Sequence, residues 1–289
     1  MKFAVIGGDM RQAKLAELLA LDGHEVSAFA IDKIRLEGGV SAYGLVKDAV
    51  SGADCVVFPL PLASTEGLLN APLSSGLHTT HEVINVLTPG QLVCAGRVDE
   101  TAREAAGSAG IELIDYLDRE ELAVLNAVAT AEGAIGLVMQ ETAITVWRSK
   151  ILVIGFGRIG QLLCHRLRGM GASITASARS YADFAWIEAY GYEKADTNGL
   201  DSILGDFDIV INTVPARVLG EQRLSKLKKS CLCLDLASKP GGLDFSAASK
   251  LGVKAMWALS LPGEVAPVTS VRIIKDTVYN ILRERGAKI

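Results

Sequence analysis

Residues Ile151–Ser180 read ILVIGFGRIGQLLCHRLRGMGASITASARS. An apolar run leads into the glycine-rich hexad Gly155–Gly160, a helical pattern follows, and a second apolar run ends at Ala178. This is the strand, turn, helix and strand order in which a GxGxxG hexad binds a dinucleotide. The stretch therefore predicts a Rossmann-type unit that begins halfway along the chain.

Each glycine of the hexad has a separate physical task. Gly155 allows the tight turn, Gly157 lets the backbone approach a pyrophosphate, and Gly160 permits close packing of helix on strand. The phosphates would lie at the positive end of the helix, where free N–H groups point outward. We therefore expect Arg158 and Ile159 to contact the cofactor together with the three glycines. The alternative is a glycine-rich turn that only packs a helix tightly.

The second strand of this unit ends without an acid. NAD enzymes usually place Asp or Glu there to bind the ribose 2′-hydroxyl. Here the residues are Ala178, Arg179 and Ser180. A guanidinium offers a 2′-phosphate a bidentate contact, and a hydroxyl adds another. The sequence therefore predicts NADP(H) as the cofactor, the alternative being an arginine that is merely solvated.

Short β-rich runs alternate with helical patterns along the whole chain, which predicts α/β architecture with parallel sheets. In the first half the expected strands are 3–7, 25–30, 54–58, 91–95 and 111–116. In the second half they are 151–155, 173–178, 208–212, 231–236 and 253–258. The same rhythm in both halves indicates two Rossmann-like, doubly wound lobes, and we expect a cleft between them.

The connecting segments set the expected domain boundaries. Residues 118–147 read as a helix start, a break near residues 127–130 and a helix from Ala131. Residues 268–285 have the apolar spacing of one further helix. We expect a substrate-type domain over 1–128 and a nucleotide domain over 129–269. The terminal helix, about 270–289, should pack back on the first domain.

Composition limits the class of protein. The chain has 289 residues, of which 49% are hydrophobic and 21% charged, which is a soluble globular balance. The formal net charge of −4 gives no reason to expect nucleic acid as a partner. Residues 2–7 already resemble a strand, so we expect no cleavable signal. No apolar run approaches the roughly 18 residues of a membrane span, so we expect a cytoplasmic protein.

The cysteine pattern argues against a metal site. The CxC pair at 231–233 and the HxxH pair at 78–81 have no second ligand cluster beside them. We therefore expect no metal, and we interpret the cysteines as small buried apolar residues. They are Cys55, Cys94, Cys164, Cys231 and Cys233.

The first half has a glycine turn of its own, in the stretch VIGGDMRQ at residues 5–12. It lacks the third glycine at the right spacing, and Asp9 would repel a phosphate, so we expect no second nucleotide site. Asp9, Arg11 and Gln12 follow the first strand, where ligands of parallel sheets bind. We therefore expect them to face a substrate, the alternative being a helix cap with a surface arginine.

Seven local motifs together resemble the A subunits of dipicolinate synthase from spore-forming bacteria, and the resemblance covers nearly the whole chain. Where we expect Asn-x-x-Pro-Thr in that family, this chain has Ala129 before Thr130. The motifs are VIGGDMRQ (5–12), NAVATAEGAI (126–135), VIGFGRIG (153–160), ARS (178–180), INTVP (211–215), LDLASKPGGLDF (234–245) and LPGEVAPVT (261–269).

The resemblance implies NADP-dependent oxidation of a dihydro- or hydroxytetrahydrodipicolinate to dipicolinic acid, a branch of the lysine pathway used in sporulation. It also implies a flavoprotein-like B subunit as partner, in the cytoplasm of the mother cell, and we expect a homo-oligomer. More distantly, the plan is similar to alanine dehydrogenase and the 2-hydroxyacid dehydrogenases. In those families a nucleotide domain is inserted into a substrate domain, which explains the late start of the fingerprint.

Strand ends in the second half supply the remaining cofactor candidates. Loops after the third and fourth strands lie where the nicotinamide and its ribose usually run, and the segment after the last strand borders the nicotinamide. The candidates are Thr213, Val214, Pro215, Ala237, Ser238 and Pro262.

A substrate with two carboxylates calls for cations and hydroxyl donors. Arg11 and Lys239 are the expected carboxylate partners, with Thr130 as a hydroxyl donor. Glu132 and Asp9 are the candidates for proton acceptor. A glutamate in the first turn of a helix is favoured by the dipole without any catalysis, and the SKPGG stretch is equally readable as a plain turn with a solvated lysine.

Two other functions stay open on the sequence. One is a dehydrogenase of an amino acid or a one-carbon folate. The other is a nucleotide-binding subunit that presents substrate to the flavoprotein and performs no hydride step, because no obvious His or Lys–Asp catalytic pair is present.

Overall fold

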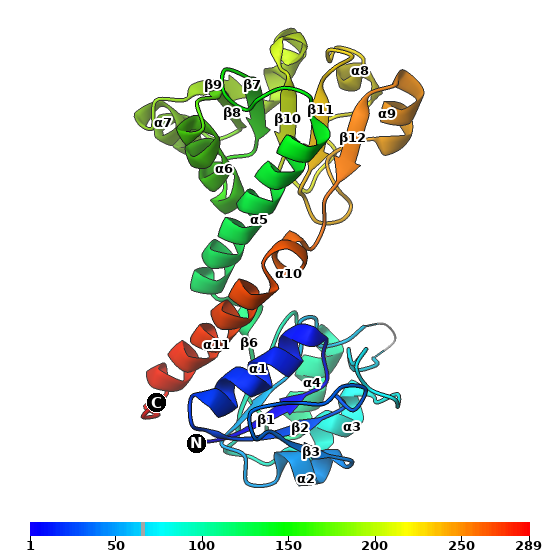
Figure 1. Ribbon diagram of the computed structural model, residues 1–289, viewed down its shortest axis with the longest axis vertical. Helices are drawn as coiled ribbons and strands as arrows, with labels where there is room; N and C mark the ends of the chain where they lie inside the picture. Colours follow the sequence, from blue (N-terminus) through cyan, green and yellow to red (C-terminus); the bar gives the residue numbers. More distant parts are fainter. Residues whose placement is uncertain (65–66) are drawn as a thin grey trace. The chain divides into compact units, whose positions relative to one another are not determined.

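The computed structural model describes residues 1–64 and 67–289. They form two compact units, of which the first is discontinuous in sequence. It comprises Met1–Leu125 together with Pro267–Ile289, and the second comprises Asn126–Ala266 (Figure 1). The boundaries expected at 128/129 and 269/270 remain predictions of where each domain ends.

The first unit is built on a six-stranded parallel sheet in the order β3-β2-β1-β4-β5-β6. The order reverses between β1 and β4, and loops on either side of such a point open outward at the carboxyl ends of the strands. The strands are β1 (Lys2–Ile6), β2 (Glu25–Phe29), β3 (Ser41–Tyr43), β4 (Cys55–Val57), β5 (Leu92–Ala95) and β6 (Leu113–Asp115).

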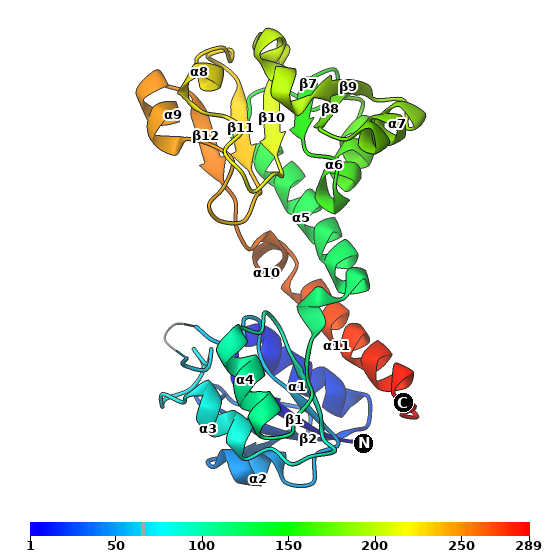
Figure 2. The same ribbon diagram turned by 180° about the vertical axis from the view of Figure 1, so that it is seen from behind.

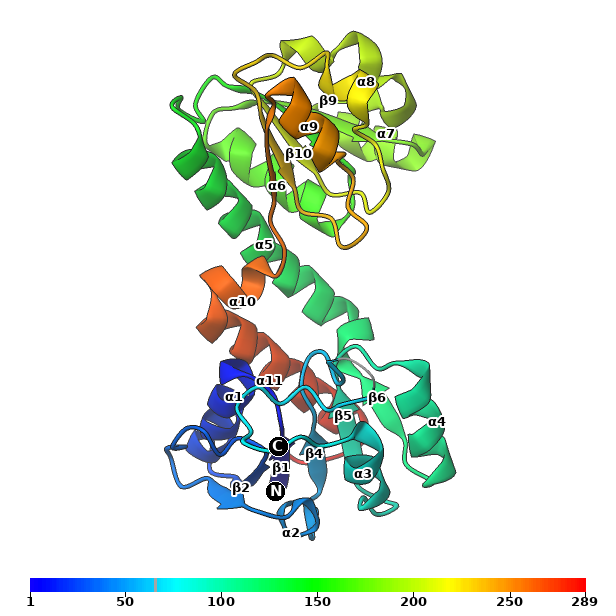
Figure 3. The same ribbon diagram turned by 90° about the vertical axis from the view of Figure 1, so that its right-hand side faces the viewer.

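Helices cover both faces of this sheet. On one face α1 (Met10–Leu21) and α11 (Pro267–Glu284) pack side by side (Figure 1). On the other lie α2 (Val46–Val50), α3 (Thr80–Asn85) and α4 (Glu100–Ser108) (Figures 2 and 3). The short η1 (Tyr116–Asp118) follows β6. The terminal helix α11 stays on the sheet because Val271, Ile274, Val278 and Leu282 form one buried apolar stripe.

The second unit repeats the arrangement with the sheet order β12-β11-β10-β7-β8-β9, and every pairing in it is parallel. Counted from its central first strand, this is the same order as in the first unit. Its reversal point lies between β7 and β10. The strands are β7 (Lys150–Ile154), β8 (Ser173–Ala178), β9 (Glu193–Asp196), β10 (Ile209–Asn212), β11 (Leu232–Asp235) and β12 (Lys254–Trp257).

Two apolar layers sandwich the second sheet. One contains α5 (Glu120–Glu141), α6 (Arg158–Gly169) and α7 (Tyr181–Ala189). The other contains η2 (Thr197–Ser202), η3 (Leu204–Asp206), α8 (Glu221–Leu224) and α9 (Phe245–Leu251). The short α10 (Leu261–Val265) packs on α5, where a Cβ on Gly133 would come within 3.0 Å of the Val265 side chain.

The helix α5 corrects one expectation. The break predicted near residues 127–130 is wrong, because α5 runs unbroken for 22 residues. The Thr130 hydroxyl donates to the Asn126 carbonyl at 2.9 Å, one turn back, so the polar side chain is satisfied inside the helix.

By length and composition alone α5 could also cross a membrane. Its buried residues belong to protein cores instead. Leu122 is buried in the first unit, and Ala131, Ala134 and Val138 are buried in the second. We therefore describe α5 as a core helix.

The predicted fold class is confirmed: the chain is α/β with two doubly wound parallel sheets. The sequence did not reveal β3 and β9. Both are short edge strands, SAY and EKAD, with mostly exposed side chains. Such edges carry little apolar signal, because only one side of the strand is paired.

Candidate functional site

The carboxyl ends of β7 and β10 mark the reversal point of the second sheet. Ligands of open α/β sheets bind in the crevice outside such a point. Four loops meet this edge, because they follow the four central strands. They begin at Gly155 after β7, Arg179 after β8, Thr213 after β10 and Leu236 after β11.

The glycines of the hexad occupy three different environments. Gly155 has a φ of +95°, and a Cβ there would lie 2.4 Å from the Thr213 hydroxyl. A Cβ on Gly160 would lie 2.1 Å from the Gly155 carbonyl oxygen. Around Gly157, in contrast, a Cβ would meet no atom of the described residues within 4 Å. Two of the glycines are therefore needed to form the turn, and the third leaves open space beside it.

That open space lies at the N-terminus of α6. Gly157 is the N-cap residue of this helix, and no side chain caps it. The first turn of any helix has N–H groups without intrahelical partners and carries a partial positive charge. The arrangement fits a pyrophosphate, because a phosphate oxygen can reach the backbone where a side chain would otherwise stand.

The three residues at the end of β8 differ in their exposure to solvent. Ala178 is buried, whereas Arg179 and Ser180 are exposed. Within the described residues, no hydrogen bond or ion pair engages Arg179. Ser180 is the N-cap of α7: it accepts from the Asp183 N–H at 3.0 Å and donates to the Asp183 carboxylate at 2.7 Å. The arginine is thus available to an anion, while the serine hydroxyl is already bonded.

The loop after β10 is tied to the hexad. The Thr213 hydroxyl donates to the Ile154 carbonyl at 2.9 Å, across the reversal point. The Val214 side chain lies against the same turn, 2.9 Å from where a Gly155 Cβ would be. Pro215 is exposed beyond it.

The loop after β11 carries further candidates. Ala237 is buried, and Ser238 and Lys239 are exposed. Lys239 has no hydrogen bond or ion pair among the described residues. Behind the loop lie Asn212 and Asp235, both fully buried and hydrogen-bonded to each other at 2.7 Å. Sequence reasoning did not single out this polar pair, although both residues end apolar strands.

The candidates on α5 have partners of their own. The Thr130 hydroxyl is bonded to its helix. The Glu132 side chain is 61% exposed and forms an ion pair with Arg166 of α6 at 3.6 Å. Glu132 lies in the middle of α5, so the expectation of a first-turn position is wrong. Pro262 lies in the first turn of α10.

The glycine turn of the first unit is built differently. Gly7 follows β1 as Gly155 follows β7, so Asp9 stands where the second unit has Gly157 and Gln12 where it has Gly160. Asp9 caps α1 by accepting from the Arg11 N–H at 2.9 Å. Gln12 is buried and donates to the Val57 carbonyl at 3.1 Å. A carboxylate of the chain therefore occupies the position at this helix end that a phosphate would need.

Arg11 is held in a fork beside that cap. Its Nε lies 3.1 Å from both carboxylate oxygens of Asp9, and its Nη2 donates to Asp9 and to the Leu60 carbonyl, each at 2.9 Å. The buried Tyr116 hydroxyl donates to the nearby Phe58 carbonyl at 3.1 Å. Burial raises the pKa of Tyr116 well above its usual value, so it remains a donor. Nη1 of Arg11 makes no hydrogen bond to the part of the chain that the structure describes.

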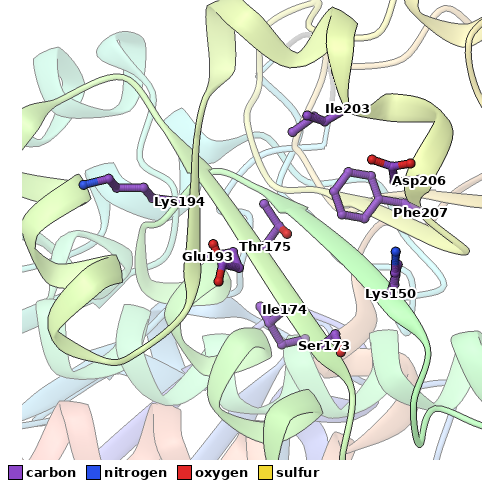
Figure 4. A pocket seen from close by; sticks show the side chains of 9 residues that line it. All are labelled: Lys150, Ser173, Ile174, Thr175, Glu193, Lys194, Ile203, Asp206 and Phe207. Atoms are coloured by element: carbon purple, nitrogen blue, oxygen red, sulfur yellow. The ribbon is translucent and has the colours of Figure 1, made fainter.

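One hollow of the second unit lies elsewhere. It has a volume of about 340 Å³ and is lined by residues that begin strands, such as Lys150, Ser173 and Glu193 (Figure 4). These amino ends are opposite to the carboxyl ends that carry the hexad. The hollow is therefore separate from the nucleotide site.

The cysteines are all free and buried. Burial raises the pKa of the Cys164 thiol to about 12, so this residue behind the hexad is an unreactive thiol. Among the described residues, no group of three or more His, Cys, Asp or Glu side chains is placed to hold a metal ion.

Two family models match the chain. Residues 2–117 match the N-terminal domain of the dipicolinate synthase A subunit. Residues 130–237 match the NAD binding domain of D-isomer specific 2-hydroxyacid dehydrogenases. The second unit thus resembles a dehydrogenase-type NAD(P)-binding domain.

Individual proteins are similar to this chain in sequence. The A subunit of dipicolinate synthase from Bacillus subtilis is 32% identical over 294 residues, which span 100% of this chain and 98% of that protein. Glyoxylate reductase of Thermococcus kodakarensis is 32% identical over 97 residues, covering 32% of this chain and 28% of that protein.

Solved structures resemble this one over its length. The dipicolinate synthase A chain of Bacillus subtilis has a TM-score of 0.90 at 30% identity, covering 98% of this chain and 96% of that one. The A subunit of dipicolinate synthase from Bacillus halodurans has a TM-score of 0.88 at 29% identity, covering 97% of each chain. L-alanine dehydrogenase, with a TM-score of 0.63 at 15% identity over 99% of this chain and 91% of that one, shares the fold alone.

Proposed function

The chain belongs to the family of dipicolinate synthase A subunits, and from that premise we propose that it is an NADP-dependent oxidoreductase that forms dipicolinic acid. The observation that carries the proposal is Arg179, an exposed cation without a partner among the described residues, directly after β8. An acid usually occupies this place in NAD enzymes. Together with the open helix end at Gly157, the arginine favours a phosphorylated dinucleotide.

The proposed reaction makes the pyridine ring of the substrate aromatic. A hydroxytetrahydrodipicolinate loses water to give a dihydrodipicolinate, which then loses one hydride and one proton. NADP+, when bound, supplies the hydride acceptor at C4 of its nicotinamide. The protein binds the two carboxylates, orients the ring and excludes water from it.

We propose Lys239 and Arg11 as candidate partners for the carboxylates of the substrate, and we describe each only within its own unit. Lys239 is exposed on the loop after β11, which meets the same sheet edge as the hexad. Arg11 is oriented by Asp9 and Leu60, with Nη1 directed to a ligand in our proposal. Held in this way, the guanidinium loses little side-chain entropy on binding.

Two carboxylates, Asp9 and Glu132, are candidates for the proton acceptor. Asp9 accepts four hydrogen bonds from Arg11, counting the backbone N–H, so both of its carboxylate oxygens are already engaged. Glu132 is paired with Arg166 and largely exposed. We propose that Glu132 takes the proton, directly or through water, because its carboxylate has only one charged partner in the described residues.

Membership of an A-subunit family implies a B subunit as partner. We propose that this partner is flavoprotein-like and that the two act in the cytoplasm of the mother cell. A homo-oligomer of this chain is part of the same proposal.

A second candidate function is a nucleotide-binding subunit that presents substrate to the partner and performs no hydride step. The observation that favours it is the engagement of both acid candidates in ion pairs. A dehydrogenase of an amino acid or folate is a further alternative, supported only by the shared fold of alanine dehydrogenase.

One measurement separates these functions. The purified chain is mixed with NADP+ and freshly made hydroxytetrahydrodipicolinate, and NADPH is followed by its absorbance at about 340 nm. We expect NADPH to form in the absence of the B subunit. Tight nucleotide binding with no NADPH would favour the non-catalytic role, and turnover of an amino acid or folate in its place would favour the third function.

A further inference from the structure

We propose that Asp235 is a positioning residue, which as an ionised carboxylate holds the loop 237–242 in the shape that presents Lys239. The inference rests on the proposed function, because the role of Lys239 toward the substrate is part of that function. Asp235 ends β11, and its side chain is fully buried.

The carboxylate fastens both ends of the loop. Oδ1 accepts from the Ala237 N–H at 3.1 Å, and Oδ2 accepts from the N–H groups of Gly242 and Leu243 at 2.7 and 3.2 Å. Oδ1 also accepts from Nδ2 of Asn212 at 2.7 Å. One side chain thus determines where the loop leaves the sheet and where it returns.

All four partners of Asp235 are N–H donors, and this sets its chemical state. Only an ionised carboxylate can accept at both oxygens without placing a proton against a donor. An amide at this position would turn its NH2 toward two N–H groups in either orientation. Asp235→Asn therefore replaces one acceptor oxygen by an NH2 group of nearly the same size, and the hydrogen bonds at one end of the loop are lost.

Asn212 links this carboxylate to the neighbouring loop. It ends β10, donates to the Val214 carbonyl at 3.0 Å and accepts from the Val214 N–H at 3.2 Å. A Cβ on Gly242 would lie 2.1 Å from its Nδ2, so only glycine admits the amide there. The Asn212–Asp235 pair therefore anchors the loops after β10 and β11 to each other where they leave the sheet. We call this anchored part of the loop 237–242 the loop base.

Trp257 supports the loop from β12. Its Nε1 donates to the Ala237 carbonyl at 2.8 Å, and its ring stacks on Phe245 with 5.5 Å between centroids. Gly241 has a φ of +81°, and a Cβ there would lie 3.0 Å from both Asp235 Oδ2 and the Trp257 ring. The fastened base contrasts with the tip at residues 238–240, which is exposed.

This contrast has a functional meaning. A lysine on a long side chain binds a carboxylate well only if the loop that carries it does not have to be ordered first. The buried anion supplies that order without touching the ligand itself. Loss of the anion should therefore weaken binding of the dicarboxylate more than binding of the nucleotide.

Trp257 provides a direct probe of the loop. The other two tryptophans, Trp147 and Trp186, are 61% and 57% exposed, so Phe can replace both. In that background the acrylamide quenching of Trp257 reports how well the loop base is closed. Asp235→Asn should raise the quenching constant about twofold or more, and an unchanged constant would overturn the inference.

Kinetics supply the readout that a merely structural residue would not change. Asp235→Asn should raise KM for the dicarboxylate about tenfold and the Kd for NADP+ by a smaller factor of about threefold, because Ala237 and Ser238 of the same loop are also cofactor candidates. The matched control is Asp244→Asn, which removes the same charge from the N-cap of α9, outside the loop base. It should leave both constants as they are, and equal effects of the two variants would contradict a special role of Asp235.

A second variant keeps the test decisive if Asp235→Asn does not fold. Trp257→Phe retains the stack on Phe245 and removes only the bond to the Ala237 carbonyl. We expect KM for the dicarboxylate to rise about threefold, and no rise would count against the positioning of the loop. If the unaltered chain forms no NADPH at all, the proposed function fails, whereas the quenching comparison still decides the role of Asp235.

Discussion

At the scale of single residues, our proposal of NADP(H) as the cofactor depends on one side chain. Arg179 replaces the acid that would bind a ribose 2′-hydroxyl, and no neighbour among the described residues neutralises it. Ser180 contributes less than the sequence predicts, because its hydroxyl already bonds to Asp183 in both directions.

The first prediction tests this residue. Arg179→Asp should raise the Kd for NADPH about 100-fold, since it removes a bidentate cation and adds a repelling charge, and should change the Kd for NADH less than about threefold. Isothermal titration calorimetry measures both. Arg148→Asp makes the same charge change on another exposed arginine, before β7, and should affect neither. Equal weakening of both nucleotides would remove the NADP assignment.

The second prediction separates two glycines of the hexad. Gly157→Val should raise the Kd for NADPH at least about 100-fold, because the new side chain fills the phosphate space, and should shift Tm by no more than about 2 °C. Gly160→Ala should instead destabilise the fold by about 2 kcal/mol or more, since its Cβ meets the Gly155 carbonyl. Calorimetry and thermal melts distinguish the two, and retained affinity in Gly157→Val would discredit the site.

The third prediction concerns the exposed lysine. Lys239→Ala should raise KM for the dicarboxylate about tenfold and leave the Kd for NADP+ within about twofold, because one charge-assisted contact is lost. Steady-state kinetics at saturating NADP+ measure the first value. Lys250→Ala, at an exposed lysine of α9, is the matched control. Identical kinetics for the two variants would mean that Lys239 is only solvated.

At the scale of elements, packing decided what local sequence patterns left ambiguous. The sequence predicts a break at residues 127–130, a stretch that contains two β-branched residues, Val128 and Thr130. It is helical because Ala131 and Ala134 are buried on the following turn and the Thr130 hydroxyl is bonded one turn back. Tertiary burial outweighs a small difference in helix propensity.

The contact between α1 and α11 carries the fourth prediction. His24, just after α1, packs between Phe3 and Tyr279 of α11. Burial lowers the pKa of His24, the N-terminal amine and Lys275 lower it further, and Asp22 opposes them. Its Nε2 is buried and has no hydrogen-bond partner within residues 1–64 and 67–289. The protein should therefore favour neutral His24.

The sign of the effect follows from proton counts. Because the folded pKa lies below the ordinary value of about 6.5, the unfolded chain binds more protons in that interval. The contribution of neutral His24 to the free energy of unfolding should be fully present above about pH 6.5. It should decrease as the pH falls through the folded pKa. His24→Phe should remove this slope, whereas His81→Gln, on the exposed side of α3, should keep it. Urea unfolding across this range measures it, and an unchanged slope in His24→Phe would refute the assignment.

At the scale of the whole molecule, two sheets with the same strand order have different binding capacities. Only the second unit retains the open helix end at Gly157. In the first unit the equivalent positions are Asp9 and Gln12, whose side chains fill the helix end and the packing space. Identical topology therefore does not determine a nucleotide site; the residues of one βα turn do.

The fifth prediction follows from this difference. Calorimetric titration should find one NADP(H) per chain, and the enthalpy should disappear with Gly157→Val. A titration with Gly8→Ala, in the first unit, should still find one. A stoichiometry of two, or a site that depends on Gly8, would contradict the account of the first unit.

The sequence by itself determined the elements with strong apolar period and the family. The hexad Gly155–Gly160, the strand before it and the motifs along the chain predicted two doubly wound sheets and membership of the dipicolinate synthase A subunits, and both predictions are confirmed. Such features are local: a strand period, a glycine that only a tight turn requires, and a motif can each be recognised without knowing the neighbours in space.

Only the tertiary structure decided which polar groups are already bonded. Asn212 and Asp235 end different strands 23 residues apart, and the sheet order alone makes them a buried pair. The sequence also did not predict the edge strands β3 and β9, whose side chains are mostly exposed. Nor did it predict that α5 is unbroken. The physical reason is common to all: burial and hydrogen bonding depend on which distant segments become neighbours, and no local pattern in the chain records that.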